Sequence, residues 1–397
     1  MSNVSKDEAL KNASNVVALL SQGSDPFISE EVRAQALQAA NLVIRALEKP
    51  EDGLIKFAFS PTTWMAIRVC AQLNVFDMIT KHETISAAEI ARIANADETL
   101  IRRLLRVLTA AGFVAEKGNG LYGPTHWTVH INSRLAQGML KFIYDSSMLP
   151  IAQGVNWLKE TGYRNPVDPQ HGMFQAANQT DMPTFKWLTV PKNKEIWDNA
   201  NTFFEGDRGS RPSWVTWFPT KEKFFPEGHQ QEVPLLVDVA GGRGHDLMEF
   251  LDKYPDELGP FVLQDQQVVL DSALSLSPKI EKQPFDLFED PPVKGARIYF
   301  MKFILHDYAD EQCMQILRNV KASMVKGYSY LVINDFILPD VGCGLLQSQW
   351  DLMMMVLLSS MERTEAQWRA LLESAGLSIE GLYLPPGDAQ GIIVATL

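Results

Sequence analysis

The hydrophobic and polar positions change their period along the chain and divide it into parts. Residues 30–48 repeat apolar side chains close to every 3.6 positions, which predicts an amphipathic helix that begins after Ser29. From residue 233 onward, short apolar runs alternate with amphipathic stretches. Such alternation predicts a parallel, doubly wound α/β sheet. Residues 126–230 are rich in tryptophan and follow neither rule.

A further unit, residues 61–125, has the order of a winged helix. We expect one helix over 61–79, two more helices that begin at Ser86 and Asp97, and a hairpin turn over 116–123. The unit carries seven basic and six acidic residues, so it is nearly neutral. A DNA-reading domain should be markedly basic, and we therefore interpret this unit as a dimerisation module.

Composition adds limits on partners and location. The net charge of −12 argues against DNA and anionic membranes as partners. No apolar run approaches the roughly 18 residues that a membrane span needs. Cys70, Cys313 and Cys343 are too widely spaced for a disulfide framework or a zinc site. Together with an N-terminus unlike a secretory signal, these features predict a cytoplasmic protein without a metal, nucleic-acid or membrane partner.

The first strand of the α/β part ends in a glycine-rich turn. Gly241, Gly242 and Gly244 allow the backbone to turn tightly and to approach a ligand closely. The next strand ends in Asp265, about twenty residues on, where a carboxylate can bind both ribose hydroxyls. The turn lacks the Lys-Ser/Thr pair of a phosphate loop, which favours a ribose-bearing cofactor with little phosphate. On these residues alone, a tight corner without a ligand is the alternative.

A histidine stands where another buried strand ends. In the stretch MKFILHDYADEQC, the apolar run Phe300–Leu305 ends abruptly in His306. A histidine with a pKa near 6.5 can take a proton from a reacting hydroxyl, although a histidine at a strand end more often has a surface or capping role. We expect Asp307 and Asp310 to cap the helix that begins near Asp310.

These motifs follow one another in the order of a known family. The stretches LLVDVAGGRGHDL, FVLQD, FDLF, MKFILHDY, YLVINDFILP and MERTEAQW resemble the fungal branch of the S-adenosylmethionine-dependent O-methyltransferases, which is similar to the plant caffeic-acid and flavonoid type. The resemblance implies a Rossmann-like class I methyltransferase domain at 231–397. It also implies a helical and winged-helix dimerisation domain at 1–125 and a helical acceptor-pocket region at 126–230. S-adenosyl-L-methionine as cofactor, a small-molecule substrate and a homodimer are expected with it.

The resemblance also implies roles for single residues. His306 matches the catalytic base, and Asp335 and Glu362 match two acids that orient it. Asp335 is one methylene shorter than the glutamate of plant members, and Ala240 stands where the family usually has its first glycine. The cofactor residues that the resemblance implies are Gly242, Gly244, Asp265, Asp286, Leu287 and Lys302. The candidates for the acceptor pocket are His126, His130, Trp187, Trp197, Phe203, Asp351, Met354 and Met355.

Two functions of different classes remain open. The first is methyl transfer to a hydroxyl of an aromatic or polyketide-type secondary metabolite, with His306 as the general base. Some fungal proteins that look like these methyltransferases are instead pericyclases, which steer a dehydration, Diels–Alder or Alder-ene reaction of a polyketide–peptide intermediate. There His126, His130, Lys302 and His306 would stabilise charge that develops on the substrate. An intact His306 favours methyl transfer, and Ala240 leans toward the pericyclase. A cofactor-binding regulator is a more distant alternative.

Overall fold

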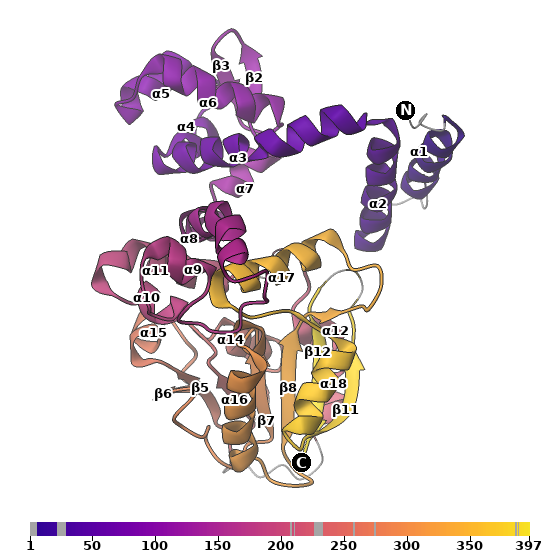
Figure 1. The fold of residues 1–397 in the computed structure, drawn as a ribbon, viewed down its shortest axis with the longest axis vertical. Helices are drawn as coiled ribbons and strands as arrows, with labels where there is room; N and C mark the ends of the chain where they lie inside the picture. Colours follow the sequence, from indigo (N-terminus) through magenta and orange to yellow (C-terminus); the bar gives the residue numbers. More distant parts are fainter. Residues whose placement is uncertain are drawn as a thin grey trace. The chain divides into compact units, whose positions relative to one another are not determined.

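The chain forms two compact units, residues 1–132 and 133–397, in a computed structural model (Figure 1). The structure describes residues 6–21, 29–206, 209, 211–225, 233–256, 259–273, 275–385, 387 and 389–397. None of the helices in these ranges is long and apolar enough to cross a membrane. The finer domain boundaries after residues 125 and 230 stay predictions.

The N-terminal unit is mainly helical and has the predicted winged-helix order. Its helices are α1 (Lys6–Leu20), α2 (Glu30–Leu47), α3 (Pro50–Gln72), α4 (Val75–Thr80), α5 (Ala87–Ala94), α6 (Glu98–Ala110) and α7 (His126–Ile131). Three short strands pair antiparallel in the order β1-β3-β2, namely β1 (Ile85–Ser86), β2 (Ala115–Gly118) and β3 (Leu121–Gly123). Ser86 and Asp97 cap α5 and α6, because their side-chain oxygens accept the backbone N–H of Glu89 and Leu100.

The single helix predicted for residues 61–79 is wrong. Helix α3 already begins at Pro50 and ends at Gln72, and α4 starts after a break. Asn74 forms that break in the left-handed conformation, with φ 56°, which asparagine tolerates better than most residues. The apolar positions continue across Asn74, so the periodicity did not reveal it.

Pro61 lies inside α3 rather than at its start. Proline has no backbone N–H, so one carbonyl in the preceding turn loses its helical donor. The hydroxyl of Ser60 donates to that carbonyl, the oxygen of Phe57, at 2.7 Å. A neighbouring side chain thus replaces the missing backbone bond, and the helix continues.

The C-terminal unit contains the α/β sheet and the helices that precede and cover it. Its helices are α8 (Arg134–Glu160), α9 (Met173–Asn178), α10 (Thr184–Leu188), η1 (Pro191–Asn193), α11 (Lys194–Phe204), α12 (Trp214–Trp217), α13 (Thr220–Phe224), α14 (His245–Lys253), α15 (Gln267–Ser272), η2 (Leu305–Asp307), α16 (Asp310–Ser323), α17 (Leu345–Leu358) and α18 (Glu365–Ser374). Its strands are β4 (Leu236–Val239), β5 (Phe261–Asp265), β6 (Ile280–Pro284), β7 (Ile298–Lys302), β8 (Tyr330–Asp335), β9 (Ile337–Leu338), β10 (Arg363–Thr364), β11 (Ser378–Tyr383) and β12 (Gly391–Thr396).

Seven strands form one sheet in the order β11-β12-β8-β7-β4-β5-β6. Strands β4 to β8 run parallel to one another, and β12 pairs antiparallel with both of its neighbours, β8 and β11. Alternate residues of a strand enter different apolar layers: Val237 and Val239 pack with α16 and α18, and Leu236 packs with α12, α13 and α14. Figure 1 shows the helices on the two faces, so the predicted doubly wound, mostly parallel sheet is confirmed.

The order of the strands also places the site. The chain leaves β4 toward β5 on one side and later returns to β7 on the other side of β4. Such a switch point opens a crevice beyond the carboxyl ends of the strands. The glycine turn after β4, Asp265 at the end of β5, Lys302 at the end of β7 and Asp335 at the end of β8 all come from that edge.

Candidate functional site

The glycine turn after β4 leaves room beside its backbone. Gly242 and Gly244 have φ of 61° and 78°, in the left-handed region that favours glycine. A Cβ at Gly242 would meet nothing within 4 Å, so a ligand can approach the backbone there. The backbone N–H of Gly242 donates to Asp265 at 2.8 Å, and that of Gln266 donates to the other oxygen of Asp265 at 2.7 Å.

Asp265 retains acceptor capacity toward this space. Burial raises the pKa of Asp265 to about 6, and the two backbone donors limit that rise. The carboxyl is therefore ionised at neutral pH, and each oxygen keeps a second lone pair for a hydroxyl donor. An open glycine turn beside an ionised acceptor fits the ribose-bearing cofactor that the sequence predicted.

Ala240 opens the turn in an unfavourable backbone conformation. Its φ is 57°, although it carries a Cβ. A left-handed alanine costs roughly 1–2 kcal/mol, a cost that glycine avoids. The conformation is the one for which the family's first glycine is suited, and the surrounding turn imposes it on alanine.

Lys302 is fixed by a buried acid at the start of α14. Its Nζ lies 3.2 Å from Asp246, and Nε2 of His245 lies 2.8 Å from the same oxygen. Burial opposes the charge of Asp246, but Lys302 and His245 outweigh it, so the pKa of Asp246 lies well below its usual range. His245 is the first residue of α14, the helix that follows the glycine turn.

Asp286 and Leu287 follow β6 in a tight turn. An oxygen of Asp286 accepts the backbone N–H of Phe288 at 2.9 Å and that of Glu289 at 3.3 Å. Leu287 packs against the apolar layer that also contains Val239. These bonds order the turn, and the adenine contact of both residues stays a prediction.

His306 lies in the short helix η2 and is buried between carboxyl groups. Its Nδ1 is 2.6 Å from Oε1 of Glu362, and its Nε2 is 3.2 Å from Oδ1 of Asp307. Burial disfavours the imidazolium, but Glu362 and Asp307 outweigh it and raise the pKa of His306 to about 10. The sequence pointed to Glu362 and passed over Asp307 as a partner.

Asp335 is close enough to affect the pKa of His306, but among the residues that the structure describes it makes no hydrogen bond to the imidazole. It is fully buried, and neither of its oxygens has a hydrogen-bond partner among the described residues. Burial raises the pKa of Asp335 well above its usual range. No hydrogen bond joins Asp335 to His306 in the described part of the chain, and its orienting role stays a prediction.

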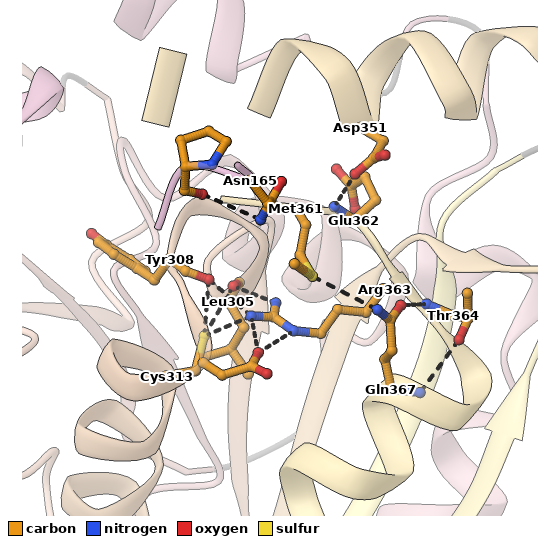
Figure 2. Close-up of polar contacts among 12 residues, drawn as sticks. Asn165, Leu305, Tyr308, Cys313, Asp351, Met361, Glu362, Arg363, Thr364 and Gln367 are labelled. Carbon is orange, nitrogen blue, oxygen red and sulfur yellow. Dashed lines mark hydrogen bonds and ion pairs between the residues drawn. The ribbon is translucent and has the colours of Figure 1, made fainter. Parts of the chain in front are cut away.

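A buried arginine holds the loop that carries His306. The guanidinium of Arg363 donates to the carbonyl oxygens of Leu305 at 2.8 Å and Tyr308 at 2.9 Å (Figure 2). It also donates to Asp310 at 2.8 Å, although only 1% of Arg363 is exposed. Arg363 directly follows Glu362, so two consecutive residues supply the anchor of the loop and the partner of the imidazole.

The two acids expected to cap α16 do not cap it. The helix begins at Asp310 as predicted, but its N-cap is Ala309 and no side chain caps it. Asp310 instead binds Arg363, and Asp307 faces His306. The two carboxylates therefore face the buried side chains of His306 and Arg363 and do not accept the backbone N–H groups at the start of α16.

Glu362 is itself positioned by a predicted pocket residue. Its backbone N–H donates to Oδ1 of Asp351, on α17, at 2.9 Å. Burial raises the pKa of Asp351, and the backbone bond from Glu362 limits the rise. Asp351 therefore supports the segment of Glu362, which is an additional role to the one predicted.

An aromatic stack covers the other side of His306. The ring of Phe303 stacks on the imidazole with centroids 4.8 Å apart and on Trp350 with centroids 5.6 Å apart. Phe203, a predicted pocket residue, stacks on Trp350 at 6.3 Å. Sequence reasoning missed Phe303 and Trp350, although Phe303 lies between Lys302 and His306 in the motif.

The remaining pocket candidates fall into separate groups. Trp187, Trp197 and Phe203 pack in one apolar cluster around Leu188 and Ala200. Met355 packs with Trp187 in a neighbouring cluster, and Met354 is buried. The remaining two candidates are on α7 in the N-terminal unit, namely His126 and His130. Their contact with an acceptor stays a prediction.

A surface depression of about 340 Å³ lies between α9, α10 and η1. Only Trp187 of the pocket candidates lines it, and neither the glycine turn nor His306 does. We therefore place the site at the strand ends and not in this depression. The residues that line it are Asn178, Gln179, Thr180, Met182, Trp187, Val190, Pro191 and Lys192.

This fold and site define a class of protein, and comparison with known proteins agrees with it. Residues 220–378 match the model of the O-methyltransferase domain, and residues 55–129 match that of the O-methyltransferase dimerisation domain. The chain is 32% identical to the O-methyltransferase penC of Penicillium thymicola, over 92% of this chain and 91% of that protein. It is 33% identical to the O-methyltransferase asqD of Emericella nidulans, over 84% and 87% respectively.

Solved structures share the whole architecture. The structure of the LepI complex with SAM superposes with a TM-score of 0.88 at 27% identity, over 99% of this chain and 100% of that chain. A structure described as "A Pericyclic Reaction enzyme" also has a TM-score of 0.88, at 26% identity, over 98% and 100%.

The chain belongs to the O-methyltransferase family that carries an N-terminal dimerisation domain. It is accordingly an O-methyltransferase by class, and S-adenosylmethionine, the methyl donor of that family, is its cofactor. The predicted resemblance and fold are thereby confirmed.

We predict that replacing Arg363 with methionine destabilises the C-terminal unit. Two buried carbonyls lose a charged donor, and a hydrogen bond to a charged group contributes about 1.5–3 kcal/mol. Urea denaturation would measure the loss. Arg369→Met is the matched control, because Arg369 is exposed and forms an ion pair with Glu365 one turn away. Equal destabilisation by both variants would contradict the anchoring role of Arg363.

We predict that Ala240→Gly stabilises the fold. Glycine removes roughly 1–2 kcal/mol of left-handed backbone strain. This gain exceeds the roughly 0.4–1 kcal/mol by which glycine favours the unfolded state through its greater conformational entropy. The same exchange at Ala322, inside α16, should instead destabilise by about 1 kcal/mol. Losses of similar size at both positions would show that Ala240 is not strained.

Proposed function

We propose that the chain methylates a hydroxyl of a small aromatic or polyketide-type secondary metabolite, with His306 as the general base. The observation that carries the proposal is the buried His306, bound at Nδ1 by Glu362 and adjacent to the glycine turn in the sheet topology. Bound S-adenosylmethionine supplies an electrophilic methyl group. The residues proposed to hold it are Gly242, Gly244, Asp265, Asp286, Leu287 and Lys302.

The protonation of His306 fits this role in two ways. Glu362 accepts the proton on Nδ1, which leaves Nε2 as the atom that can receive a proton from the acceptor. In the acceptor-free protein His306 is charged at neutral pH, so it can act as a base only after Nε2 has released its proton. A phenol has a pKa of about 10, so a neutral imidazole whose conjugate acid titrates in that range accepts the phenol proton without a large energetic cost.

Asp307 has a part in this chemistry. It stands 3.2 Å from Nε2 in the acceptor-free protein, where it favours the imidazolium. An acceptor hydroxyl that takes its place at Nε2 separates the imidazole from one of two carboxylates. The pKa of His306 then falls, which favours the neutral imidazole that a base requires.

A pericyclase is the second candidate function. It is supported by the structural neighbour described as a pericyclic reaction enzyme and by the unusual Ala240 at the cofactor turn. His126, His130, Lys302 and His306 would then stabilise charge on the substrate. The pairing of His306 with Glu362 supports methyl transfer instead, because charge stabilisation alone does not need an oriented base.

A homodimer accompanies either function. The dimerisation-domain match covers residues 55–129, and exposed apolar side chains occur along the helices α2 and α3. These side chains include Leu47, Leu54, Phe57 and Phe59. Apolar surface of this extent is typical of a face that another chain covers.

We predict that His306→Ala lowers turnover by about 10²–10⁴-fold. A producer strain that lacks the gene would be complemented with the wild type, His306→Ala or the control His171→Ala, whose exposed imidazole binds Asp168. Mass spectrometry of small metabolites should show a compound one CH₂ lighter than the product in the strain with His306→Ala. Accumulation of isomers of the product, or of compounds that differ by water, would favour the pericyclase.

We also predict that Glu362→Gln lowers the pKa of His306. The Glu362 carboxylate stabilises the imidazolium, so an uncharged amide withdraws that stabilisation. NMR titration of the acceptor-free protein should show wild-type His306 charged up to about pH 10 and the variant neutral at lower pH.

The stability difference between the wild type and Glu362→Gln follows from the same shift. The raised pKa stabilises the fold fully below about pH 6.5, and this contribution is lost as the pH rises through about 10. An unchanged titration of His306 in the variant would contradict the assigned contact.

A further inference from the structure

The last turn of α11 touches both halves of the proposed site. Glu205, which caps this helix, lies 2.5 Å from Nη1 of Arg243, a residue inside the glycine turn. Phe203, two residues earlier, stacks on Trp350. One helix end therefore contacts the cofactor turn through a carboxylate and the aromatic stack through a ring.

The carboxylate end is a partly buried charge network. Glu205 and Arg243 are 18% and 20% exposed, and Arg134 also forms an ion pair with Glu205. Burial opposes the charge of Glu205, but Arg134 and Arg243 outweigh it and lower its pKa. Nε of Arg243 donates to the hydroxyl of Ser272 at 3.0 Å, so two partners fix the arginine side chain. The network thereby constrains a turn in which Ala240, Gly242 and Gly244 have positive φ.

The aromatic end reaches the proposed base through three stacked contacts. Trp350 and Phe303 are nearly parallel, with 6° between their planes, and Phe303 lies at 27° to the imidazole of His306. Phe303 has a φ of 52°, which is strained for a bulky residue. Such a conformation persists only when packing on both sides maintains it, and here Trp350 and His306 supply that packing.

We propose that the last turn of α11 links the cofactor turn to His306 and so aligns the two. In this role Glu205 and Arg243 are positioning residues for the cofactor turn. Phe203 and Trp350 are positioning residues for Phe303 and His306. The inference rests on the proposed function, since it takes the glycine turn as the cofactor site and His306 as the base. A ligand that binds the cofactor turn then changes the environment of Trp350, and a change at Trp350 alters the affinity of the turn for the ligand to the same extent.

The first experiment tests whether Glu205 and Arg243 support cofactor binding, with S-adenosylhomocysteine as the probe. Calorimetry would give its affinity for the full-length wild type, Glu205→Ala, Arg243→Ala and the double variant. Each single variant should weaken binding about tenfold, and the double variant should bind no more weakly than Arg243→Ala, because contacting residues are not additive. Glu195→Ala, an exposed change in the first turn of α11, should bind like the wild type. Effects of Glu205→Ala and Arg243→Ala that multiply would overturn the inference.

The second experiment measures how the environment of Trp350 responds when the probe binds. If Glu205 only stabilised the fold, its replacement would not change this response. In protein labelled with 5-fluorotryptophan, the fluorine resonance of Trp350 is the one lost in Trp350→Phe. Saturating S-adenosylhomocysteine should shift it in the wild type and in Glu195→Ala, and should leave it unshifted in Glu205→Ala and Phe203→Leu. Melting curves without the probe would verify that these variants fold.

The outcomes distinguish failure of this inference from failure of the proposed function on which it rests. A wild type that binds the probe without a shift of Trp350, or variants that keep the full shift, would overturn the inference alone. A wild type that does not bind S-adenosylhomocysteine would overturn the proposed cofactor turn and the inference with it.

Discussion

The buried guanidinium of Arg363 is the contact on which the geometry of the site depends. Removing a cation from water is costly, and the cost is offset here because two carbonyls and Asp310 accept its N–H groups. The accepting segment carries His306, and the residue before Arg363 is Glu362. A single desolvated group therefore determines both where the imidazole lies and which carboxylate faces its Nδ1.

Charge and backbone strain are distributed unevenly around this anchor. Lys302 keeps Asp246 ionised beneath the glycine turn, whereas burial raises the pKa of Asp335 well above its usual range. Left-handed non-glycine residues stand on both sides of the site, Ala240 at the cofactor turn and Phe303 beside the imidazole. Strain of this kind persists where surrounding contacts over-determine the backbone, as functional sites commonly require.

Much of the architecture followed from local patterns. Alternating apolar runs predicted the parallel sheet, and the glycine turn with Asp265 at the next strand end predicted one edge of it as the site. These predictions succeed because parallel strands bring their carboxyl ends to one edge whatever the loops do. The helix predicted over 61–79 failed because Asn74 interrupts the backbone without interrupting the apolar rhythm.

The sequence by itself determined the family, the order of elements and the strand end at which His306 stands. Only the tertiary structure decided which acids meet it. Asp307, Asp335 and Glu362 are equally able to accept a proton as isolated side chains, and 56 positions separate His306 from Glu362. Asp335 is buried without a hydrogen-bond partner among the described residues, and Asp310 binds Arg363, so Glu362 and Asp307 are the acids that face His306. Such choices depend on distances between remote segments, which no local pattern encodes.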